Sequence, residues 1–427
     1  MRQLLNLLQE GVTAAHAIRY VKQDLLEKGF QELFLKEDWK LKENGKYYVN
    51  LYGTNCVAFT VGRRIDKEPS FRICMAHSDY PNFQIKPNPV LKGANWTKLN
   101  VEIYGGMYQK SWLDRPLGIA GRVVVRGKTA FTPEVLLYKS ERPLAVIPSL
   151  AIHMDRELNK KGALDVAKEL VPLVSLSEDG DLLEEIAGTL GIGKDEILDY
   201  DLFLYNMDKP VLVGLDSAML SSPRLDNLTS VGAVLEALEQ CREVPDNTID
   251  VMVVFDNEEV GSLSKQGADS ELLPMVLDKI GKAVAGKEFV LRDVVEDSFL
   301  LSVDVAHAHH PNYEEKSDAS SKAYMGQGFS IKRSVGQKYG TTSESAAVLK
   351  QLSGERNIPY TIAINKTGIP GGSTLGPIVT SHLPIPCADI GMPVLSMHSA
   401  SELGAVADYD ALKSIICAVF EEGAQAE

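Results

Sequence analysis

Several features that would mark a secreted or membrane protein are scarce or missing in this sequence of 427 residues. Its five cysteines are scattered and form no CxxC pair, which argues against a disulfide framework and favours a reducing compartment. No apolar run approaches the roughly 18 residues of a membrane span. Residues 1–30 are typical of an amphipathic helix rather than a signal peptide. We therefore expect a cytoplasmic protein with no membrane partner.

Positive charge is also in short supply. The chain has 44 Lys and Arg against 58 Asp and Glu, for a net charge of -14. Nucleic acid and anionic membranes bind basic patches, so neither is an expected partner. The GxSxG motif of serine hydrolases is absent, as are the P-loop lysine pattern and the GxGxxG spacing of nucleotide sites.

The chain is too long for one ordinary hydrophobic core, so two domains are expected. A helix over 3–30 and strands over 47–62 and 70–77 come first. From residue 217 onward, helices alternate with continuous apolar strands. That alternation predicts an α/β domain whose sheet is covered on both faces.

The pattern changes in the middle of the chain. Short strand-like segments follow about residue 86, and a helical stretch is predicted near 157–198. We therefore expect one domain from 1–88 and 217–427, with a second, mainly β domain inserted at 89–216.

Polar residues follow four of the predicted buried strands directly. In open α/β sheets, ligands bind beyond the carboxyl ends of the strands, so these residues can converge although they are far apart in the chain. Asp226, just before a predicted helix, joins them. The four strand ends carry His77-Ser78-Asp79, Asn257-Glu258-Glu259, Asp304 and His398. The simpler alternative for each residue is a strand end or helix cap in solvent.

Two adjacent glutamates directly after a buried strand are unfavourable by themselves, because neighbouring carboxylates repel and a buried carboxylate needs a partner. A bound cation would be such a partner. Imidazole and carboxylate donors suit Zn²⁺, Mn²⁺ or Co²⁺, and two ions need about five or six protein ligands, one of them bridging. The candidate ligands are His77, Asp226, Glu259, Asp304 and His398.

Glu258 is then left over as a general base that takes a proton from metal-bound water. The reversed assignment, with Glu258 as ligand and Glu259 as base, is the alternative. Asp79, two residues after His77, is placed to orient that imidazole.

Six segments, in order, resemble the successive motifs of the aspartyl aminopeptidase family, which includes vacuolar and bacterial di-zinc aminopeptidases. They are MAHSDYPNFQIKP, SPRLDNLTS, FDNEEVGS, SVDVAHAHHPNY, IPGGSTLGP and SMHSASE. The resemblance extends from about residue 15 to 420. It implies a mixed-sheet α/β/α zinc-exopeptidase domain with an inserted, mainly β dimerisation domain. It also implies removal of N-terminal residues from oligopeptides by a bridging-water, two-metal mechanism.

The resemblance assigns roles to the ligands. It implies one ion, most simply Zn²⁺, held by His77, Asp226 and Asp304. A second ion is held by Asp226, Glu259 and His398, with Asp226 as the bridge. Co²⁺ and Mn²⁺ remain open.

The resemblance further implies dimers that assemble into a hollow dodecamer. In that assembly, His153 of the insert reaches a neighbouring active site and helps stabilise the tetrahedral intermediate. The segment SIKRSVGQKYGTT matches a substrate-binding stretch of the family, which makes Lys332 and Tyr339 candidates for substrate contacts.

Other residues are candidates for contacts around the site. Residues 369–377 are glycine-rich, and we expect the backbone at Gly371 and Gly372 to line the peptide cleft, where glycine allows close approach. His307 and His310 are expected to form hydrogen bonds near the site, without a third metal.

Three questions stay open at this level. The residue before the scissile bond can be acidic or neutral, because Ser401 stands where the family often has Arg. A di-metal amidohydrolase or dipeptidase acting on another amide is an alternative, as is an inactive metal-binding scaffold. Glu258 argues against the scaffold, since a structural zinc site closes with four protein ligands and needs no base.

Overall fold

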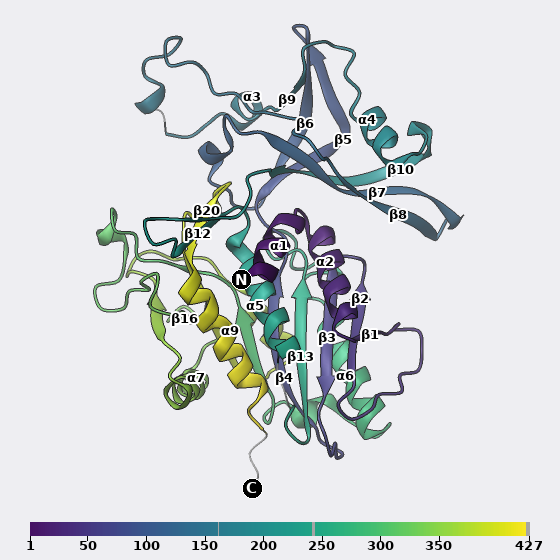
Figure 1. The fold of residues 1–427 in the computed structure, drawn as a ribbon, viewed down its shortest axis with the longest axis vertical. Coiled ribbons are helices and arrows are strands. Elements are labelled where there is room, and N and C mark those ends of the chain that lie inside the picture. The colour runs from purple at the N-terminus through teal and green to yellow at the C-terminus, as the bar shows by residue number, and fades with distance from the viewer. Residues whose placement is uncertain (161, 241–243, 424–427) are drawn as a thin grey trace. The chain divides into compact units, whose positions relative to one another are not determined.

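Fully buried strands form the centre of the main sheet. The computed structural model describes residues 1–160, 162–240 and 244–423, and Figure 1 shows the sheet as a row of arrows. Its strands, in spatial order, are β1 (Gln31–Glu32), β2 (Lys46–Leu51), β3 (Asn55–Val61), β13 (Thr248–Phe255), β4 (Ser70–His77), β14 (Phe299–Val303), β18 (Cys387–Gly391), β16 (Phe329–Arg333) and β17 (Tyr360–Ile364). The central strands β13, β4, β14 and β18 run parallel. Every residue of β13 and β4 is buried, as expected for strands covered on both faces.

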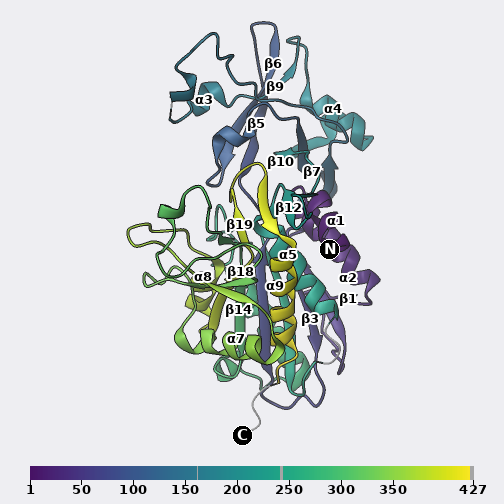
Figure 2. The ribbon, with the colours of Figure 1, turned by 60° about the vertical axis from the view of Figure 1, so that its left-hand side comes forward.

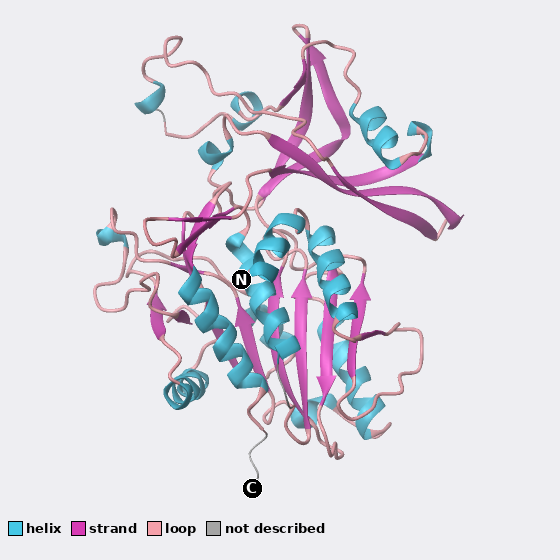
Figure 3. Cartoon of the chain, in the orientation of Figure 1, coloured by secondary structure: helices cyan, strands magenta, loops and turns pink. Residues whose placement is uncertain are grey.

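Helices cover both faces of this sheet (Figures 2 and 3). Alternate residues of β4 face opposite layers: Cys74 and Ala76 pack into one apolar core, and Ile73 and Met75 into the other. The first core includes residues of α1 (Arg2–Glu10), α2 (Ala14–Glu27), α5 (Leu225–Gln240), α7 (Ser343–Arg356) and α9 (Val406–Phe420). The second includes residues of α6 (Leu272–Ala285) and α8 (Leu375–His382). The expected α/β/α arrangement is thereby confirmed.

A second, smaller sheet belongs to the same unit. Its order is β11 (Val211–Val213), β12 (Met219–Ser222), β20 (Glu402–Ala405), β19 (Pro393–Leu395) and β15 (Ala306–His307). The strand that precedes His398 lies here and not in the main sheet, so our placement of it was wrong. The fourth parallel strand of the main sheet is instead β18, where the buried Asp389 interrupts the apolar run.

The chain divides into two units. The first comprises Met1–Asp79, Pro210–Met397 and Glu402–Glu427, and the second comprises Tyr80–Lys209 and His398–Ser401. The inserted part thus begins at residue 80 rather than 89, because β5 is one long strand that starts at Asn82. It ends at 209 rather than 216, because β11 pairs with β12 of the first unit.

The second unit is built on a six-stranded antiparallel sheet. Its order is β8 (Thr132–Lys139), β7 (Leu117–Thr129), β10 (Ile197–Asn206), β5 (Asn82–Gly93), β6 (Trp96–Tyr104) and β9 (Leu173–Ser175). Its α-helices within the described residues are α3 (Val166–Glu169) and α4 (Leu182–Leu190). The helical stretch expected near 157–198 was therefore wrong, and the other described residues of that stretch form 3₁₀ turns, loops, β9 and the start of β10.

The described residues also form short 3₁₀ turns. They are Gln109–Trp112, Leu158–Lys160, Lys194–Glu196, Leu291–Val294 and Glu314–Lys316. Among the residues described, no helix combines the length and apolar character needed to cross a bilayer.

Candidate metal centre

The parallel strands deliver their polar ends to one edge of the main sheet. His77 is the last residue of β4 and pairs in register with Phe255, the last residue of β13. Glu258 follows Phe255 by three positions, and Asp304 directly follows β14, which pairs with β4 on its other side. The carboxyl ends of three parallel strands therefore meet here, as the sequence predicted.

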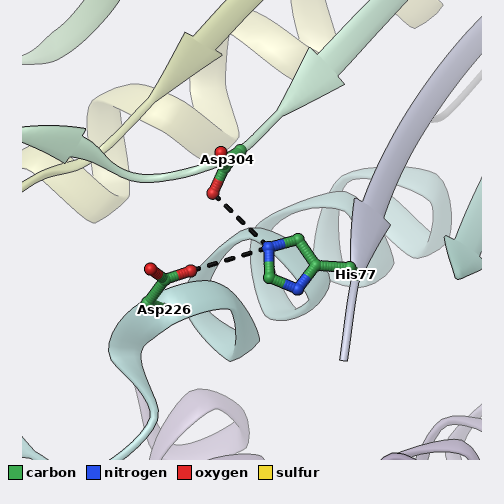
Figure 4. Close-up of side chains that lie close together, drawn as sticks. All are labelled: His77, Asp226 and Asp304. Carbon is green, nitrogen blue, oxygen red and sulfur yellow. Dashed lines mark ion pairs between the residues drawn. The ribbon is translucent and has the colours of Figure 1, made fainter. Parts of the chain in front are cut away.

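His77 lies between two carboxylates (Figure 4). Its Nε2 is 3.6 Å from Asp226 Oδ1 and 3.6 Å from Asp304 Oδ1. All three side chains are nearly or largely buried. Ligands of a tetrahedral zinc ion at bond lengths near 2.1 Å stand roughly 3.4 Å apart. The spacing of these three donors therefore suits a single ion of that size.

Asp226 is held in place by its backbone. It lies in a non-helical kink at the start of α5, with φ -77° and ψ 107°, and the Asp226–Asn227 peptide bond is cis. Its N–H donates to Glu402 Oε2 at 2.9 Å. The neighbouring Asn227 side chain donates to the carbonyl of Val303 at 2.9 Å. Because Val303 precedes Asp304, these contacts tie the two carboxylate donors together.

The other ring nitrogen of His77 fixes the orientation of its imidazole. Nδ1 lies 3.1 Å from the backbone carbonyl of Asp79 and 3.4 Å from Asp79 Oδ1. A hydrogen bond from Nδ1–H to these oxygens leaves the Nε2 lone pair directed at Asp226 and Asp304. Asp79 therefore contacts the imidazole as expected, and its nearest oxygen is that of its own main chain.

The two glutamates also lie at this edge. An oxygen of Glu259 and one of Asp226 lie within 4.8 Å of each other. Glu258 Oε2 lies 4.0 Å from His77 Nε2. The backbone amides of both glutamates donate to the carboxylate of Asp79, each at 3.1 Å. Two adjacent carboxylates are thus held beside an already acidic cluster.

His398 belongs to the short segment that groups with the second unit. Its Nδ1 lies 2.9 Å from the carbonyl oxygen of Gly106, in the same unit. Donation from Nδ1–H to that carbonyl places the lone pair on Nε2, the arrangement that metal-ligating histidines adopt.

The charges of the cluster are poorly balanced by the protein. Burial alone would lower the pKa of His77, but Glu258, Asp304 and Asp79 raise it well above its usual range. Burial raises the pKa of Glu258 to about 8, against the opposing effect of His77. Buried carboxylates crowded in this way need positive charge to stay ionised. A divalent cation supplies that charge, and the mixture of imidazole and carboxylate donors suits zinc, cobalt or manganese.

Lys332 is a buried lysine at the site. Its Nζ donates to Asp304 Oδ2 at 3.2 Å and to the carbonyls of Asp304 and Val305 at 3.3 and 3.0 Å. The ring of Tyr339 lies 4.9 Å from Nζ. Burial alone would raise the pKa of Asp304, but Lys332 and His77 lower it below its usual range. The two predicted substrate-binding residues therefore contact each other, and the lysine contacts a candidate ligand.

The remaining predicted residues lie in loops or at strand ends. His153 is exposed in a turn of the second unit, and His307 is exposed at the end of β15. His310 contacts its own loop, through the amide of Asn312 and the ring of Tyr313. Gly371 has a φ of +61°, and a side chain there would meet Asn365. Gly372 has open space around it. Their substrate contacts stay predictions.

Two supporting residues escaped the sequence analysis. Glu402 accepts the Asp226 amide, and Asn227 holds the strand that ends at Asp304. Both occur inside segments that resemble the family motifs, SMHSASE and SPRLDNLTS. Their presence in those segments was the available signal, but their contacts join positions far apart in the chain.

Together, the sheet edge and its donors define a metal-dependent hydrolase of the α/β/α type. The family model described as "Aminopeptidase I zinc metalloprotease (M18)" matches residues 7–420. The chain belongs to this family of zinc aminopeptidases, which confirms the expected enzyme class and metal.

Similar proteins agree with this assignment. A probable M18 family aminopeptidase 2 of Clostridium acetobutylicum is 39% identical over 416 residues, covering 96% of this chain and 95% of that protein. One of Clostridium novyi is 40% identical over 413 residues, covering 95% of both. The chain in the structure titled "Cryo-EM structure of the Ape4 and Nbr1 complex" is 31% identical, with a TM-score of 0.92 over 98% of this chain and 84% of that one.

Proposed function

We propose that this aminopeptidase holds two divalent ions, most simply zinc, at the edge of its main sheet. His77, Asp226 and Asp304 would hold one ion, and their 3.6 Å spacing around Nε2 carries the proposal. Asp226, Glu259 and His398 would hold the other. His398 directly follows Met397 of the first unit, and the contact of its Nδ1 with Gly106 favours Nε2 as the donor.

The reaction is the hydrolysis of the first peptide bond of an oligopeptide. When bound, the ions supply Lewis acidity that polarises the scissile carbonyl and makes water a better nucleophile. Glu258, beside His77, takes the proton of the attacking water and delivers it to the leaving amine. Asp79 keeps Glu258 at that position by binding its backbone amide.

Selectivity for the chain terminus follows from the acidic cluster. A protonated α-amine is attracted by carboxylates, and a neutral α-amine can donate its lone pair to a bound ion, whereas an interior peptide nitrogen offers neither charge nor a basic lone pair. The residue released can be acidic or neutral. Lys332, Tyr339, His307, His310, Gly371 and Gly372 are the proposed substrate contacts.

We propose that the protein works in the cytoplasm as a homo-oligomer, with dimers assembled into a dodecamer. The expectation rests on the family resemblance and on the scarcity of cysteine. A similar structure is titled a dodecamer of mApe1 from S. cerevisiae, with a TM-score of 0.84 at 24% identity. In such an assembly His153 would contribute to a neighbouring active site. Sedimentation velocity measures the particle directly, and a monomer at micromolar concentration contradicts this part of the proposal.

The test of the function is a panel of aminoacyl-p-nitroanilides, each with a free and an N-acetylated α-amine. Zinc-loaded protein should cleave only the free amines, and Glu258→Gln should lose about 10²–10⁴-fold in kcat while it still binds two ions. Glu288→Gln, at an exposed position, is the matched control and should keep full activity. Equal cleavage of acetylated substrates would contradict the exopeptidase function and favour the amidohydrolase alternative. No cleavage with any metal would establish the scaffold.

A further inference from the structure

Asp389 is a fully buried carboxylate in the middle of β18, with 0% of its surface exposed. Its neighbours Ala388 and Ile390 belong to the apolar core under α5 and α9. Burying an ionised carboxylate is costly unless it is paired and hydrogen-bonded. Strand pairing uses only backbone groups, so it does not explain a buried carboxylate in the central sheet. The contacts of the Asp389 side chain must therefore explain why it is buried there.

The contacts of Asp389 lead to the loop that carries Tyr339. Oδ2 accepts the backbone N–H of Gly340 at 2.5 Å. The N–H of Asp389 itself donates to Thr341 Oγ1 at 2.8 Å. The two residues after Tyr339 thus both bind Asp389. Gly340 binds its side chain, and Thr341 binds its main chain. A bond from an amide to an ionised carboxylate is stronger than one between neutral groups.

A second glycine-containing loop meets the same carboxylate. Gly376 lies in the first turn of α8, directly after the segment with Gly371 and Gly372, and its N–H donates to Ser302 Oγ at 3.1 Å. A side chain at position 376 would place its Cβ 2.4 Å from Asp389 Oδ2. The close approach of this loop to Asp389 therefore requires glycine.

Asp389 also faces Lys332. Ile331 pairs with Ile390 in the antiparallel register of β16 and β18, so Lys332 and Asp389 occupy the next positions along their strands. The negative charge of Asp389 is among those that favour the ammonium of Lys332. One buried carboxylate thus contacts or faces all three segments that carry the proposed substrate contacts at Lys332, Tyr339 and Gly371–Gly372.

We propose that Asp389 is a positioning residue for substrate, which fixes the loops at 339–341 and 371–376 relative to Lys332. The inference rests on the proposed function, because it assigns those loops to peptide binding. Within the part of the chain that the structure describes, Asp389 forms hydrogen bonds with Gly340 and Thr341 and with none of the candidate metal ligands. Its loss should therefore weaken substrate binding and leave both ions in place.

The test is Asp389→Asn in the full-length, zinc-loaded protein. The amide keeps the shape of the side chain but removes the charge that binds Gly340 and faces Lys332. We expect KM for a good free-amine p-nitroanilide to rise at least about tenfold, since small misplacements of positioning groups have effects of this size. We expect kcat to change less, and the metal content by mass spectrometry to equal that of the wild type.

Asp250→Asn is the matched control. Asp250 is also 0% exposed in a parallel strand of the same sheet, β13, and the structure shows no hydrogen-bond partner for its carboxylate within the described chain. A general effect of neutralising a buried aspartate would appear in both variants. An equal KM in the two variants, or loss of metal from Asp389→Asn, overturns the proposal.

Two milder variants cover the case in which Asp389→Asn does not fold. Thr341→Val removes only the hydroxyl that accepts the Asp389 amide, and Gly376→Ala forces the second loop and the Asp389 carboxylate apart. Each should raise KM in the same direction, and an unchanged KM in both contradicts the proposal. If wild-type protein cleaves no free-amine substrate, the proposed function has failed. If it cleaves them and these variants behave as wild type, only the role of Asp389 has failed.

Discussion

Asp79 binds the backbone of Glu258 through its side chain, with Oδ1 accepting the Glu258 amide at 3.1 Å. Its Oδ2 accepts the next amide, that of Glu259, at the same distance. The same residue offers its backbone carbonyl to His77 Nδ1. A single aspartate thus sets the positions of one imidazole and two glutamates. Its position two residues after His77 had suggested only that it orients the imidazole.

Asp79→Asn should therefore damage catalysis without removing any proposed ligand. One of its oxygens becomes an NH₂ group that faces an N–H donor, so one of the two amide contacts is lost. We expect activity to fall about 10–100-fold, the size of effect seen for groups that orient ligands. Steady-state kinetics with metal analysis measures both quantities.

Asp318→Asn serves as the control, since Asp318 accepts backbone amides in an exposed loop in the same manner. It should leave kcat unchanged. Wild-type activity for Asp79→Asn would show that the amides of Glu258 and Glu259 need no anionic acceptor.

Lys332 provides a second prediction. The proposed role is to bind substrate, but its ammonium already binds Asp304 and Val305. All three N–H donors of its ammonium have acceptors, on Asp304 and Val305. Lys332→Met removes the ammonium that pairs with Asp304, and breaking a buried ion pair typically costs about 3–5 kcal/mol. We expect kcat/KM to fall by the same factor for aspartyl and leucyl substrates, together with weaker metal binding.

Lys350→Met, on the exposed side of α7, is the matched control and should change neither quantity. If only the aspartyl substrate is affected by Lys332→Met, the lysine binds an acidic side chain of the substrate directly. The comparison of the two substrates thus separates recognition of a carboxylate from support of Asp304.

The sequence predicted which side chains meet at the sheet edge better than the strands around them. His77 and Glu258 follow strands that are apolar throughout, and such strands are easily recognised as buried. β18 was missed because Asp389 interrupts a run of only five residues. The strand before His398 was assigned to the wrong sheet, since a short apolar run does not show which partner it pairs with.

Long-range contacts account for the rest of what was not predicted. Glu402 meets Asp226 across 176 positions of the chain, and Lys332 meets Asp304 across 28. Nothing in the local sequence reports such pairs. The expected helix near 157–198 failed for a local reason, because Pro172 and Gly180 interrupt its helical pattern.

Removal of the metal should destabilise the first unit. Without the metal ions, the carboxyl groups of Asp226, Asp304 and Glu258 lie crowded around one imidazole, and the cost of keeping them ionised there favours unfolding. A ligand present at 100 times its Kd stabilises by about 2.7 kcal/mol. We expect a chelator to lower the unfolding temperature by about 3–8 °C, as measured by differential scanning fluorimetry.

Added Zn²⁺ should restore the unfolding temperature of the stripped protein. Glu258→Gln should respond to the chelator like the wild type, because Glu258 is not a proposed ligand. His77→Ala should respond much less. An unfolding temperature that is the same with and without the metals would contradict binding at this cluster.

A pH dependence unrelated to the metal is expected from the N-terminal helices. The side chain of Gln3 in α1 donates to Asp24 Oδ2 of α2 at 2.6 Å and to Glu239 Oε2 of α5 at 3.0 Å. Burial and the nearby Asp24 carboxyl raise the pKa of Glu239 from 4.5 to about 8. The folded protein therefore keeps a proton on this glutamate that the unfolded chain has already released.

The sign of the effect follows from proton linkage. Between pH 4.5 and about 8 the folded state binds more protons than the unfolded state, so stability falls as the pH rises and levels off above that window. The side chain of Glu239 is partly exposed, so solvent screening reduces the effect to about 1–2 kcal/mol in total. Glu239→Gln carries no charge at any pH and should remove this part of the slope. At pH 9 it should be more stable than the wild type.

Urea unfolding at pH 5, 7 and 9 measures the prediction. Buried carboxyls elsewhere, such as Asp408 with a pKa of about 6, contribute equally to both proteins, so the difference between them isolates Glu239. Glu27→Gln, at an exposed position of α2, should keep the wild-type slope. If Glu239→Gln also keeps the wild-type slope of stability against pH, Glu239 does not hold the extra proton. The pH dependence of stability then does not come from the contact between α1, α2 and α5.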